Sequence, residues 1–179
     1  MLSGITEENL WRNESVKAGQ IIHRIQEDSR QVMESMDDII WTVNPQNDSL
    51  SKIILRLKEF ALPLAESKGI VLNFQGFSMI DATTLSMEVR RNIYLICKEA
   101  LNNLLKYSQA SERNIRFQIE LKTLLITIKD NGIGFDNKAF ISRNGLRNLQ
   151  ERAKELRGEF AIESEFGKGM SIMLKVPII

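Results

Sequence analysis

The sequence has little cysteine and little histidine. Its 179 residues include one cysteine, Cys97, and one histidine, His23. A single cysteine excludes an internal disulfide framework, and one residue of each kind argues against a structural zinc site. The longest uncharged run, Gly69–Ile80, has 12 residues, fewer than the roughly 20 that span a bilayer. Residues 2–15 contain three glutamates and an arginine, which a signal peptide would not have.

Neither sign of charge dominates the chain. There are 24 lysines and arginines against 23 aspartates and glutamates, so the formal net charge is +1. Without a basic surface, binding to DNA or RNA is not expected. The composition, 43% hydrophobic and 26% charged, is that of an ordinary folded protein. We therefore expect a cytoplasmic chain that binds no nucleic acid and makes no membrane contact.

The first part of the chain carries a heptad pattern, which predicts a helix from about Ser15 to Thr42, ended by Pro45. An apolar stripe of this kind needs a partner helix, so the pattern predicts a homodimer; packing on the chain's own domain is the alternative. The heptad seam consists of Ile22, Ile25, Ser29, Val32, Met36, Ile39 and Val43.

The rest of the chain alternates between helical and strand periodicity, which predicts an α+β fold: a two-layer α/β sandwich with a mixed, mostly antiparallel sheet. We expect two parts, residues 1–45 and residues 46–179. Turn and N-cap chemistry before the first helix of the second part is expected from Asn47, Asp48 and Ser49, and Gly158 is expected at the left-handed C′ position after the last helix. The expected helices are one that begins at Leu50 and is stopped by Gly69, Ser86–Ser108 and Leu146–Leu156. The expected strands are Ile70–Phe74, Asn114–Leu121, Leu124–Lys129, Glu159–Glu163 and Ser171–Val176, with Lys122–Thr123 as the link of a hairpin.

One face of the predicted helix Ser86–Ser108 carries polar groups at helical spacing. Glu99 and Asn103 are four residues apart, and Lys106 lies seven residues after Glu99. A carboxylate, a carboxamide oxygen and an ammonium on one face are suited to a hydrated Mg²⁺ and a polyphosphate. An ordinary solvated helix face with an ion pair would have the same pattern.

Three glycine-containing segments follow in the second part. Asp130-Asn131-Gly132-Ile133-Gly134 ends a strand without the Gly-Lys-Ser/Thr of a phosphate loop, and its aspartate could accept a hydrogen bond from an exocyclic amine such as that of adenine. Asn144-Gly145-Leu146 begins a helix, where free N–H groups favour anions. Gly167-Lys168-Gly169 permits close approach to a ligand. Taken singly, each is also an ordinary turn or cap.

The order of these four motifs resembles the ATP-binding domain of bacterial sensor histidine kinases, in the superfamily of gyrase, chaperone and mismatch-repair ATPases. The resemblance covers about Ser86 to Pro177. The segment Met36–Pro45 is similar to the end of the dimerisation hairpin's second helix in nitrate-sensor-like kinases of the Bacteroidetes type.

The resemblance implies a site for ATP and Mg²⁺. Asn103 would ligate Mg²⁺, Glu99 would order the metal's water or assist proton transfer, and Lys106 would contact phosphate. Residues 136–144 would form a short lid over the nucleotide. The base and phosphates would be held by Asp130, which receives the adenine amine, by Gly132 and Gly134 at the pocket floor, by Gly145 and Leu146 at the triphosphate, and by Gly167 and Gly169 closing the base pocket.

The chain departs from the family pattern in three ways. Tyr107 stands where the family often has histidine, and Met170 where it often has a hydroxyl residue. The phosphoacceptor histidine followed by an acidic residue is absent, because His23 is followed by Arg24. A solvent-facing histidine is the favoured interpretation of His23.

The resemblance implies a catalytic portion that donates the γ-phosphoryl of ATP to a histidine and then to a response regulator receiver domain. The parent would be an inner-membrane sensor, and this chain alone would bind Mg·ATP without autophosphorylation. Two alternatives remain: a non-catalytic, nucleotide-gated dimerisation module, and a serine kinase of the anti-sigma type, which would not need the Ile22–Val43 seam.

Overall fold

The structure, a computed structural model, describes residues 2–76, 83–135 and 144–178, with side chains from residue 16 onward and, in the last helix, from residue 147. The chain divides into two compact units, Met1–Trp41 and Thr42–Ile179, and each is described separately. None of the helices in the described ranges includes a stretch that is apolar enough to cross a membrane.

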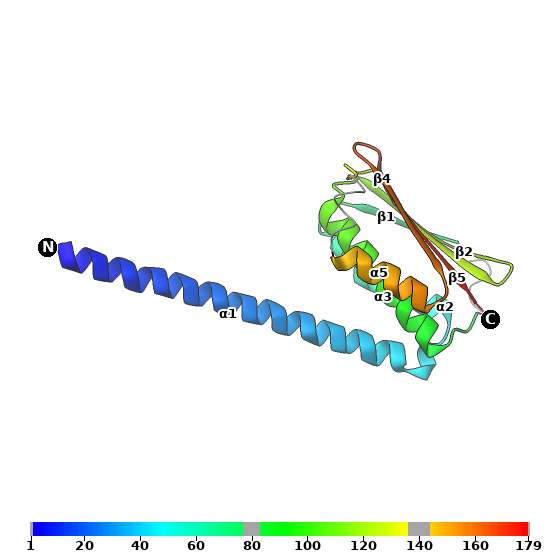
Figure 1. The fold of residues 1–179 in the computed structure, drawn as a ribbon, viewed down its shortest axis with the longest axis horizontal. Coiled ribbons are helices and arrows are strands. Elements are labelled where there is room, and N and C mark those ends of the chain that lie inside the picture. Colours follow the sequence, from blue (N-terminus) through cyan, green and yellow to red (C-terminus); the bar gives the residue numbers. More distant parts are fainter. Residues whose placement is uncertain (1, 77–82, 136–143, 179) are drawn as a thin grey trace. The chain divides into compact units, whose positions relative to one another are not determined.

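The first unit belongs to one continuous helix, α1 (Leu2–Val43), drawn in blue in Figure 1. The prediction of a start at Ser15 was wrong, because a helix extends readily once formed and residues 2–14 contain no proline to stop it. The helix ends where Asn44 turns extended, with φ −63° and ψ 120°, before Pro45 begins a short 3-10 helix, η1 (Pro45–Asn47). The apolar side chains of the heptad seam are between 47 and 59% exposed.

The second unit is built on a five-stranded sheet in the order β1-β2-β3-β5-β4. β1 pairs with β2 in parallel, and the other neighbours are antiparallel. The predicted mixed, mostly antiparallel sheet is therefore confirmed. The strands are β1 (Val71–Gln75), β2 (Glu112–Glu120), β3 (Thr123–Asp130), β4 (Glu159–Glu165) and β5 (Gly169–Pro177).

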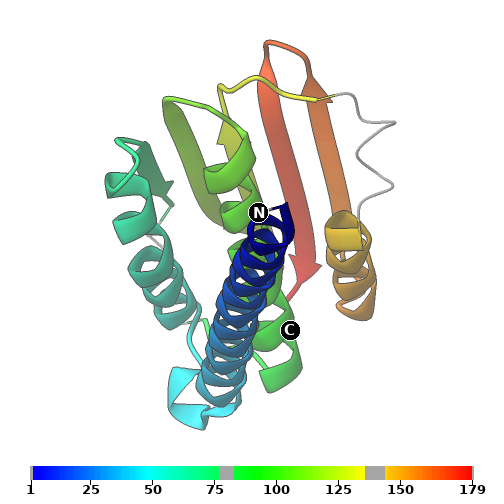
Figure 2. The same cartoon turned by 90° about the vertical axis from the view of Figure 1, so that its left-hand side faces the viewer.

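Three helices of this unit cover one face of the sheet, as Figure 2 shows. They are α2 (Leu50–Glu66), α3 (Met87–Tyr107) and α5 (Asn144–Glu155). The core lies between the two layers, because the strands turn alternate side chains toward the helices. Its fully buried members include Leu57, Ile93, Leu101, Ile115, Phe117, Ile126 and Leu174.

Of three local predictions in this unit, one was confirmed in position and two were wrong. Ser49 is the N-cap residue of α2, although its hydroxyl pairs with the Ser51 hydroxyl (3.0 Å) and not with a backbone N–H. Arg157, with φ 52°, occupies the left-handed position after α5, whereas Gly158 follows it and leaves no room for a Cβ, which would lie 2.5 Å from the Lys175 carbonyl oxygen. The β2–β3 turn is residues 121–122, both at positive φ, one residue before the predicted link.

Candidate functional site

The polar face of α3 forms one wall of the candidate site. The helix is started by Ser86, whose hydroxyl accepts a hydrogen bond from the Val89 N–H (3.4 Å). Near its other end, Asn103 Nδ2 donates to Glu99 Oε1 at 2.9 Å. This bond leaves the carboxamide oxygen of Asn103 as the atom that can accept a hydrogen bond or ligate a cation.

Asp130 is the last residue of β3, and its side chain occupies a core-facing position. Its Oδ1 accepts a hydrogen bond of 2.7 Å from the Gly132 N–H. Its Oδ2 is buried and has no hydrogen-bond partner among the described residues. Burial raises the pKa of the Asp130 carboxyl above its ordinary value, and the Gly132 N–H, the charge of Arg113 and the Met170 N–H oppose this rise.

Three glycines let the segments around Asp130 approach one another closely. A Cβ on Gly132 would lie 1.9 Å from the Ser108 carbonyl oxygen, at the end of α3. A Cβ on Gly134 would lie 2.0 Å from the Glu165 carbonyl oxygen, and one on Gly169 would lie 2.1 Å from the Asp130 carbonyl oxygen. Glycine at these positions therefore draws α3, the loop after β3 and the β4–β5 turn together.

Backbone hydrogen bonds hold the loop after β3 in this place. The Ile133 N–H donates to the Ser108 carbonyl oxygen (2.9 Å), and the Gly167 N–H donates to the Ile133 carbonyl oxygen (2.8 Å). The Ser164 hydroxyl accepts from the Phe135 N–H (2.9 Å). The loop is thus fixed on both sides before any ligand binds.

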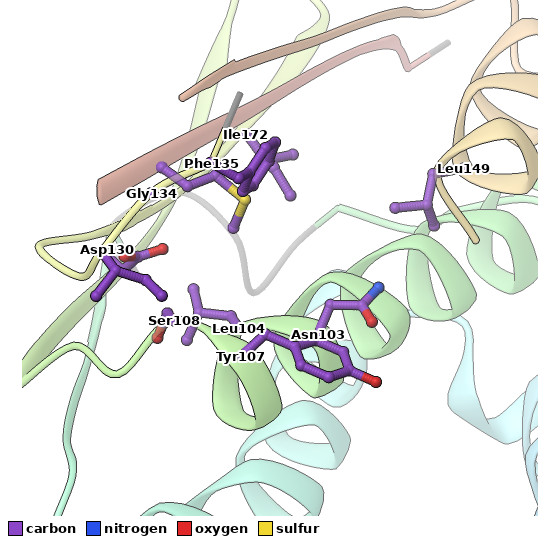
Figure 3. A pocket seen from close by; sticks show the side chains of 11 residues that line it. Asn103, Leu104, Tyr107, Ser108, Asp130, Gly134, Phe135, Leu149 and Ile172 are labelled. Carbon is purple, nitrogen blue, oxygen red and sulfur yellow. The ribbon is translucent and has the colours of Figure 1, made fainter. Parts of the chain in front are cut away.

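These segments enclose a cavity whose walls are mainly apolar. Figure 3 shows Asp130 on one side of it and Asn103 and Leu149 on the other, with Phe135 and Ile172 above. An apolar slot with a single inward carboxylate suits a flat ring that offers one amine donor. The cavity is lined by Asn103, Leu104, Tyr107, Ser108, Asp130, Ile133, Gly134, Phe135, Leu149, Met170 and Ile172.

The structure brings some of the predicted site residues together and leaves others apart. Asn103, Asp130 and Gly134 line the cavity, and Glu99 is joined to it through Asn103. The segments that line the cavity are held together by the backbone contacts of Gly132, Gly167 and Gly169 described above. Lys106 is exposed and does not line the cavity. Gly145 and Leu146 lie in the first turn of α5, and the expected lid, residues 136–144, lies outside the described residues except for Asn144.

Two of the three departures from the family pattern, Tyr107 and Met170, line the cavity. Sequence reasoning missed the apolar lining, for which no local signal exists, and it missed Arg113. This arginine is 1% exposed and lies opposite Asp130 in the β2–β3 register. The alternation of Arg113, Ile115 and Phe117 along one strand was a signal that could have found it.

The chain was compared with protein families and curated proteins. Residues 88–179 match the family described as "Histidine kinase-, DNA gyrase B-, and HSP90-like ATPase". The signal transduction histidine-protein kinase/phosphatase DegS of Bacillus subtilis (strain 168) is 31% identical over 135 residues, which cover 70% of this chain. The corresponding kinase/phosphatase UhpB of Salmonella typhimurium (strain LT2) is 29% identical over 177 residues, or 96% of this chain. The chain spans about a third, 34%, of the length of each.

The fold was also compared with solved structures. The histidine kinase AdeS of Acinetobacter baumannii superposes with a TM-score of 0.64 at 14% identity, over 85% of this chain and 79% of that one. At this level of identity the likeness concerns the fold alone. It agrees with the predicted histidine-kinase ATPase fold.

Proposed function

Because the chain belongs to the histidine kinase-, DNA gyrase B- and HSP90-like ATPase family, we propose that its cavity binds the adenine base of ATP against Asp130. The chain is the ATP-binding catalytic portion of a histidine kinase, as the match of residues 88–179 and the kinase relatives indicate. We infer that the complete protein donates the γ-phosphoryl of ATP to a histidine and then to the receiver domain of a response regulator.

The observation that carries the nucleotide proposal is the buried, unpartnered Oδ2 of Asp130 at the end of an apolar cavity. A buried acceptor without a donor is costly, and the exocyclic amine of adenine would supply that donor. Oδ1 is already used by the Gly132 N–H. Guanine presents a carbonyl where adenine presents its amine, so the same carboxylate would reject it.

Magnesium fits the α3 wall only together with the nucleotide. Within the described ranges, no cluster of three or more His, Cys, Asp or Glu could hold a metal by itself. Mg²⁺ ordinarily takes one or two protein oxygens and completes its shell with phosphate oxygens and water. Asn103 would contribute its carboxamide oxygen, Glu99 would hold that amide and order the metal's water, and bound Mg²⁺ would neutralise the charge of the phosphates.

The remaining predicted residues would act on the phosphates. Lys106 lies on α3 beyond the cavity and is exposed, so it would reach a phosphate that projects outward. Gly145 and Leu146 lie at the N-terminus of α5, where backbone N–H groups favour anions. Gly167 and Gly169 would close the base pocket, because they fix the β4–β5 turn against the loop after β3.

A calorimetric titration tests the nucleotide proposal. We expect ADP and a non-hydrolysable ATP analogue to bind, with the analogue binding more tightly in the presence of Mg²⁺, and GDP to bind far more weakly. Asp130→Asn should lower the affinity about ten- to a hundredfold, because an amide has one acceptor oxygen where the site needs two. The matched control is Glu163→Gln, on the exposed edge of the unit. Retained affinity in Asp130→Asn would refute the assignment of the base site.

The magnesium assignment has its own pair of variants. Asn103→Ala should abolish the difference in affinity with and without Mg²⁺, while leaving binding of ADP without metal close to that of the native chain. Asn102→Ala, the neighbouring carboxamide that does not line the cavity, should keep the magnesium effect. A magnesium effect that survives Asn103→Ala would remove Asn103 from the metal site.

The exposed seam of α1 supports a homodimer as the partner of this chain. Its apolar side chains are about half exposed at heptad spacing, which two helices can cover mutually. We expect concentration-dependent dimers by sedimentation equilibrium. Ile25→Glu combined with Val32→Glu should weaken them strongly, whereas Glu27→Gln outside the seam should not. A monomer at high concentration would contradict this part of the proposal.

The second candidate, a nucleotide-gated dimerisation module, is favoured by one observation. The only histidine, His23, is exposed and is followed by Arg24, and not by the acidic residue that follows the phosphoacceptor histidine in the family pattern. Incubation with γ-labelled ATP separates the candidates for this chain. Label that is stable to base and lost in acid would mark a phosphohistidine, and its disappearance in His23→Ala would overturn the view that this chain does not phosphorylate itself.

A further inference from the structure

A buried arginine lies behind the nucleotide cavity without lining it. Arg113 is in β2, faces the core and is 1% exposed. Charged side chains are almost never buried to this extent unless they are paired. Its neighbours on the same face of the strand, Ile115 and Phe117, are ordinary core residues. The buried charge therefore calls for an explanation other than packing.

The guanidinium binds the C-terminal end of α3 and the turn that follows it. Nη1 donates to the Ala110 carbonyl oxygen (2.7 Å), and Nη2 donates to the Ser108 hydroxyl (2.6 Å) and, at 3.5 Å, to the Leu104 carbonyl oxygen. The C-terminal end of a helix carries partial negative charge, so a cation stabilises it. Arg113 thus fixes the end of the helix that carries Asn103 and Tyr107.

The same side chain faces the carboxylate at the other wall of the cavity. Arg113 and Asp130 are directly opposed in the antiparallel β2–β3 register, so their side chains lie on the same face of the sheet. The charge of Arg113 lowers the pKa of Asp130 against the effect of burial, and Asp130 acts reciprocally on the arginine. Arg113 Nε and Asp130 Oδ2 are the two buried side-chain polar atoms without a hydrogen bond in the described part of the chain.

We propose that Arg113 is a positioning residue of the nucleotide site: its guanidinium holds the end of α3 by hydrogen bonds, and its positive charge, on the same face of the sheet as Asp130, keeps that carboxylate an anionic acceptor. This inference rests on the proposed ATP site. Arg113 does not line the cavity, so it acts on the ligand only through the α3 end and Asp130.

The proposal has a consequence for the pH dependence of binding. A protonated Asp130 would lose acceptor capacity, and loss of the arginine's charge would make protonation easier. Two of the described charged or titratable groups face this carboxylate or share its cavity: Arg113 from β2 and Tyr107 from α3. The loop after β3 and strand β5 contribute only the backbone N–H groups of Gly132 and Met170. Acidification should therefore weaken nucleotide binding at a higher pH without Arg113 than with it.

The test measures ADP affinity by calorimetry between pH 5.5 and 8.5 for the native chain, Arg113→Met and Arg116→Met. Arg116 is the matched control, because it is exposed on the same strand and binds only Gln75 among the described residues. The phosphates of ADP titrate equally with all three proteins, so differences between profiles belong to the protein.

We expect Arg113→Met to bind ADP about tenfold more weakly at pH 7, and its loss of affinity on acidification to begin at a higher pH than in the native chain. Arg116→Met should match the native profile. Arg113→Lys keeps the charge but not the forked donors, so it should lower the affinity while leaving the position of the pH profile unchanged.

Two results would overturn the proposal. One is a folded Arg113→Met with native affinity and profile; the other is a loss of affinity that is equal at every pH, which a merely structural role predicts. If Arg113→Met does not fold, native affinity in Arg113→Lys would overturn it. The two levels of inference fail separately: a native chain that binds no ADP refutes the ATP site, whereas native binding with an unaltered Arg113→Met refutes only the role of Arg113.

Discussion

Replacing Gly132 by alanine tests how the base site is built. The added Cβ would lie 1.9 Å from the Ser108 carbonyl oxygen and 2.8 Å from Asp130 Oδ1. Ordinary contacts begin at 3.4 Å, so the carbonyl would have to retreat by about 1.5 Å, the difference between 3.4 and 1.9 Å. Both obstacles are fixed, because one is backbone and the other is a carboxylate held by the Gly132 N–H.

Two hydrogen bonds are lost if both obstacles move away from the added Cβ. One joins the Ile133 N–H to the Ser108 carbonyl oxygen at 2.9 Å, and the other joins the Gly132 N–H to Asp130 Oδ1 at 2.7 Å. A neutral buried bond contributes about 0.5–1.5 kcal/mol and one to a charged group about 1.5–3 kcal/mol. We therefore expect Gly132→Ala to lower the free energy of unfolding by about 2–4 kcal/mol.

The assay is urea denaturation followed by circular dichroism, together with ADP titration of the folded variant. Gly69→Ala is the control. Gly69 has φ 64°, and a Cβ added there would have no other atom within 4 Å. This variant therefore carries only the conformational cost of a left-handed residue, about 1 kcal/mol. Binding should fall at least tenfold in Gly132→Ala, because Asp130 is displaced, and remain native in Gly69→Ala.

Equal stability of the Gly132→Ala and Gly69→Ala variants, with native ADP affinity in both, would refute this reasoning. It would mean that the loop after β3 can move away from α3 without cost. The close approach of Gly132 to Ser108 would then not be a requirement of the site.

Three further predictions concern other parts of the second unit. Burial raises the pKa of Cys97 to about 12. The thiol of the folded chain should therefore react with Ellman's reagent at pH 8 far more slowly than the thiol of the chain unfolded in urea. Equal rates would contradict the burial of Cys97. Because burial raises the pKa of Asp130, its contribution to stability is present at low pH and is lost as the pH rises through the folded-state pKa. The unfolding free energy of Asp130→Asn, measured relative to that of the native chain, should therefore increase from pH 4 to 7. A difference that stays constant with pH would refute this. Asn92 is buried and joins α3 to α5 by hydrogen bonds to Glu155 (3.1 Å) and Arg152 (3.1 Å). Asn92→Ala should lower the free energy of unfolding by about 1–3 kcal/mol, which would appear as a lower urea midpoint. An unchanged midpoint would show that these two hydrogen bonds contribute nothing to stability.

Local periodicity was enough to predict most of the elements. The stripe that included Ile93, Ala100 and Leu104 predicted α3, and these side chains are all buried. The hairpin of β2 and β3 and the mixed sheet were also predicted. These features depend on spacings of two and between three and four residues, which the chain carries in every context.

Termini and caps were predicted less well, because several residues compete for each role. Ser49 takes the N-cap position of α2 as predicted, but its hydroxyl pairs with Ser51 and makes no capping bond. Gly158 was expected in the left-handed position, and Arg157 takes it because Gly158 is needed where the chain passes the Lys175 carbonyl. Each of these outcomes was decided by a contact with a neighbouring group, and nothing in the local sequence distinguishes it from the alternative.

The sequence by itself determined the kinds of residue at the candidate site: an aspartate at a strand end, a carboxylate and carboxamide one turn apart, and glycines at the turns. Only the tertiary structure decided which of them meet. It brings Asn103 and Asp130 to one cavity, leaves Lys106 outside it, and buries Arg113 opposite Asp130. The reason is that a helix or strand follows from short-range spacing, whereas the cavity is formed by segments far apart in the chain, whose approach depends on close packing of the glycine backbones and on pairing of buried charges.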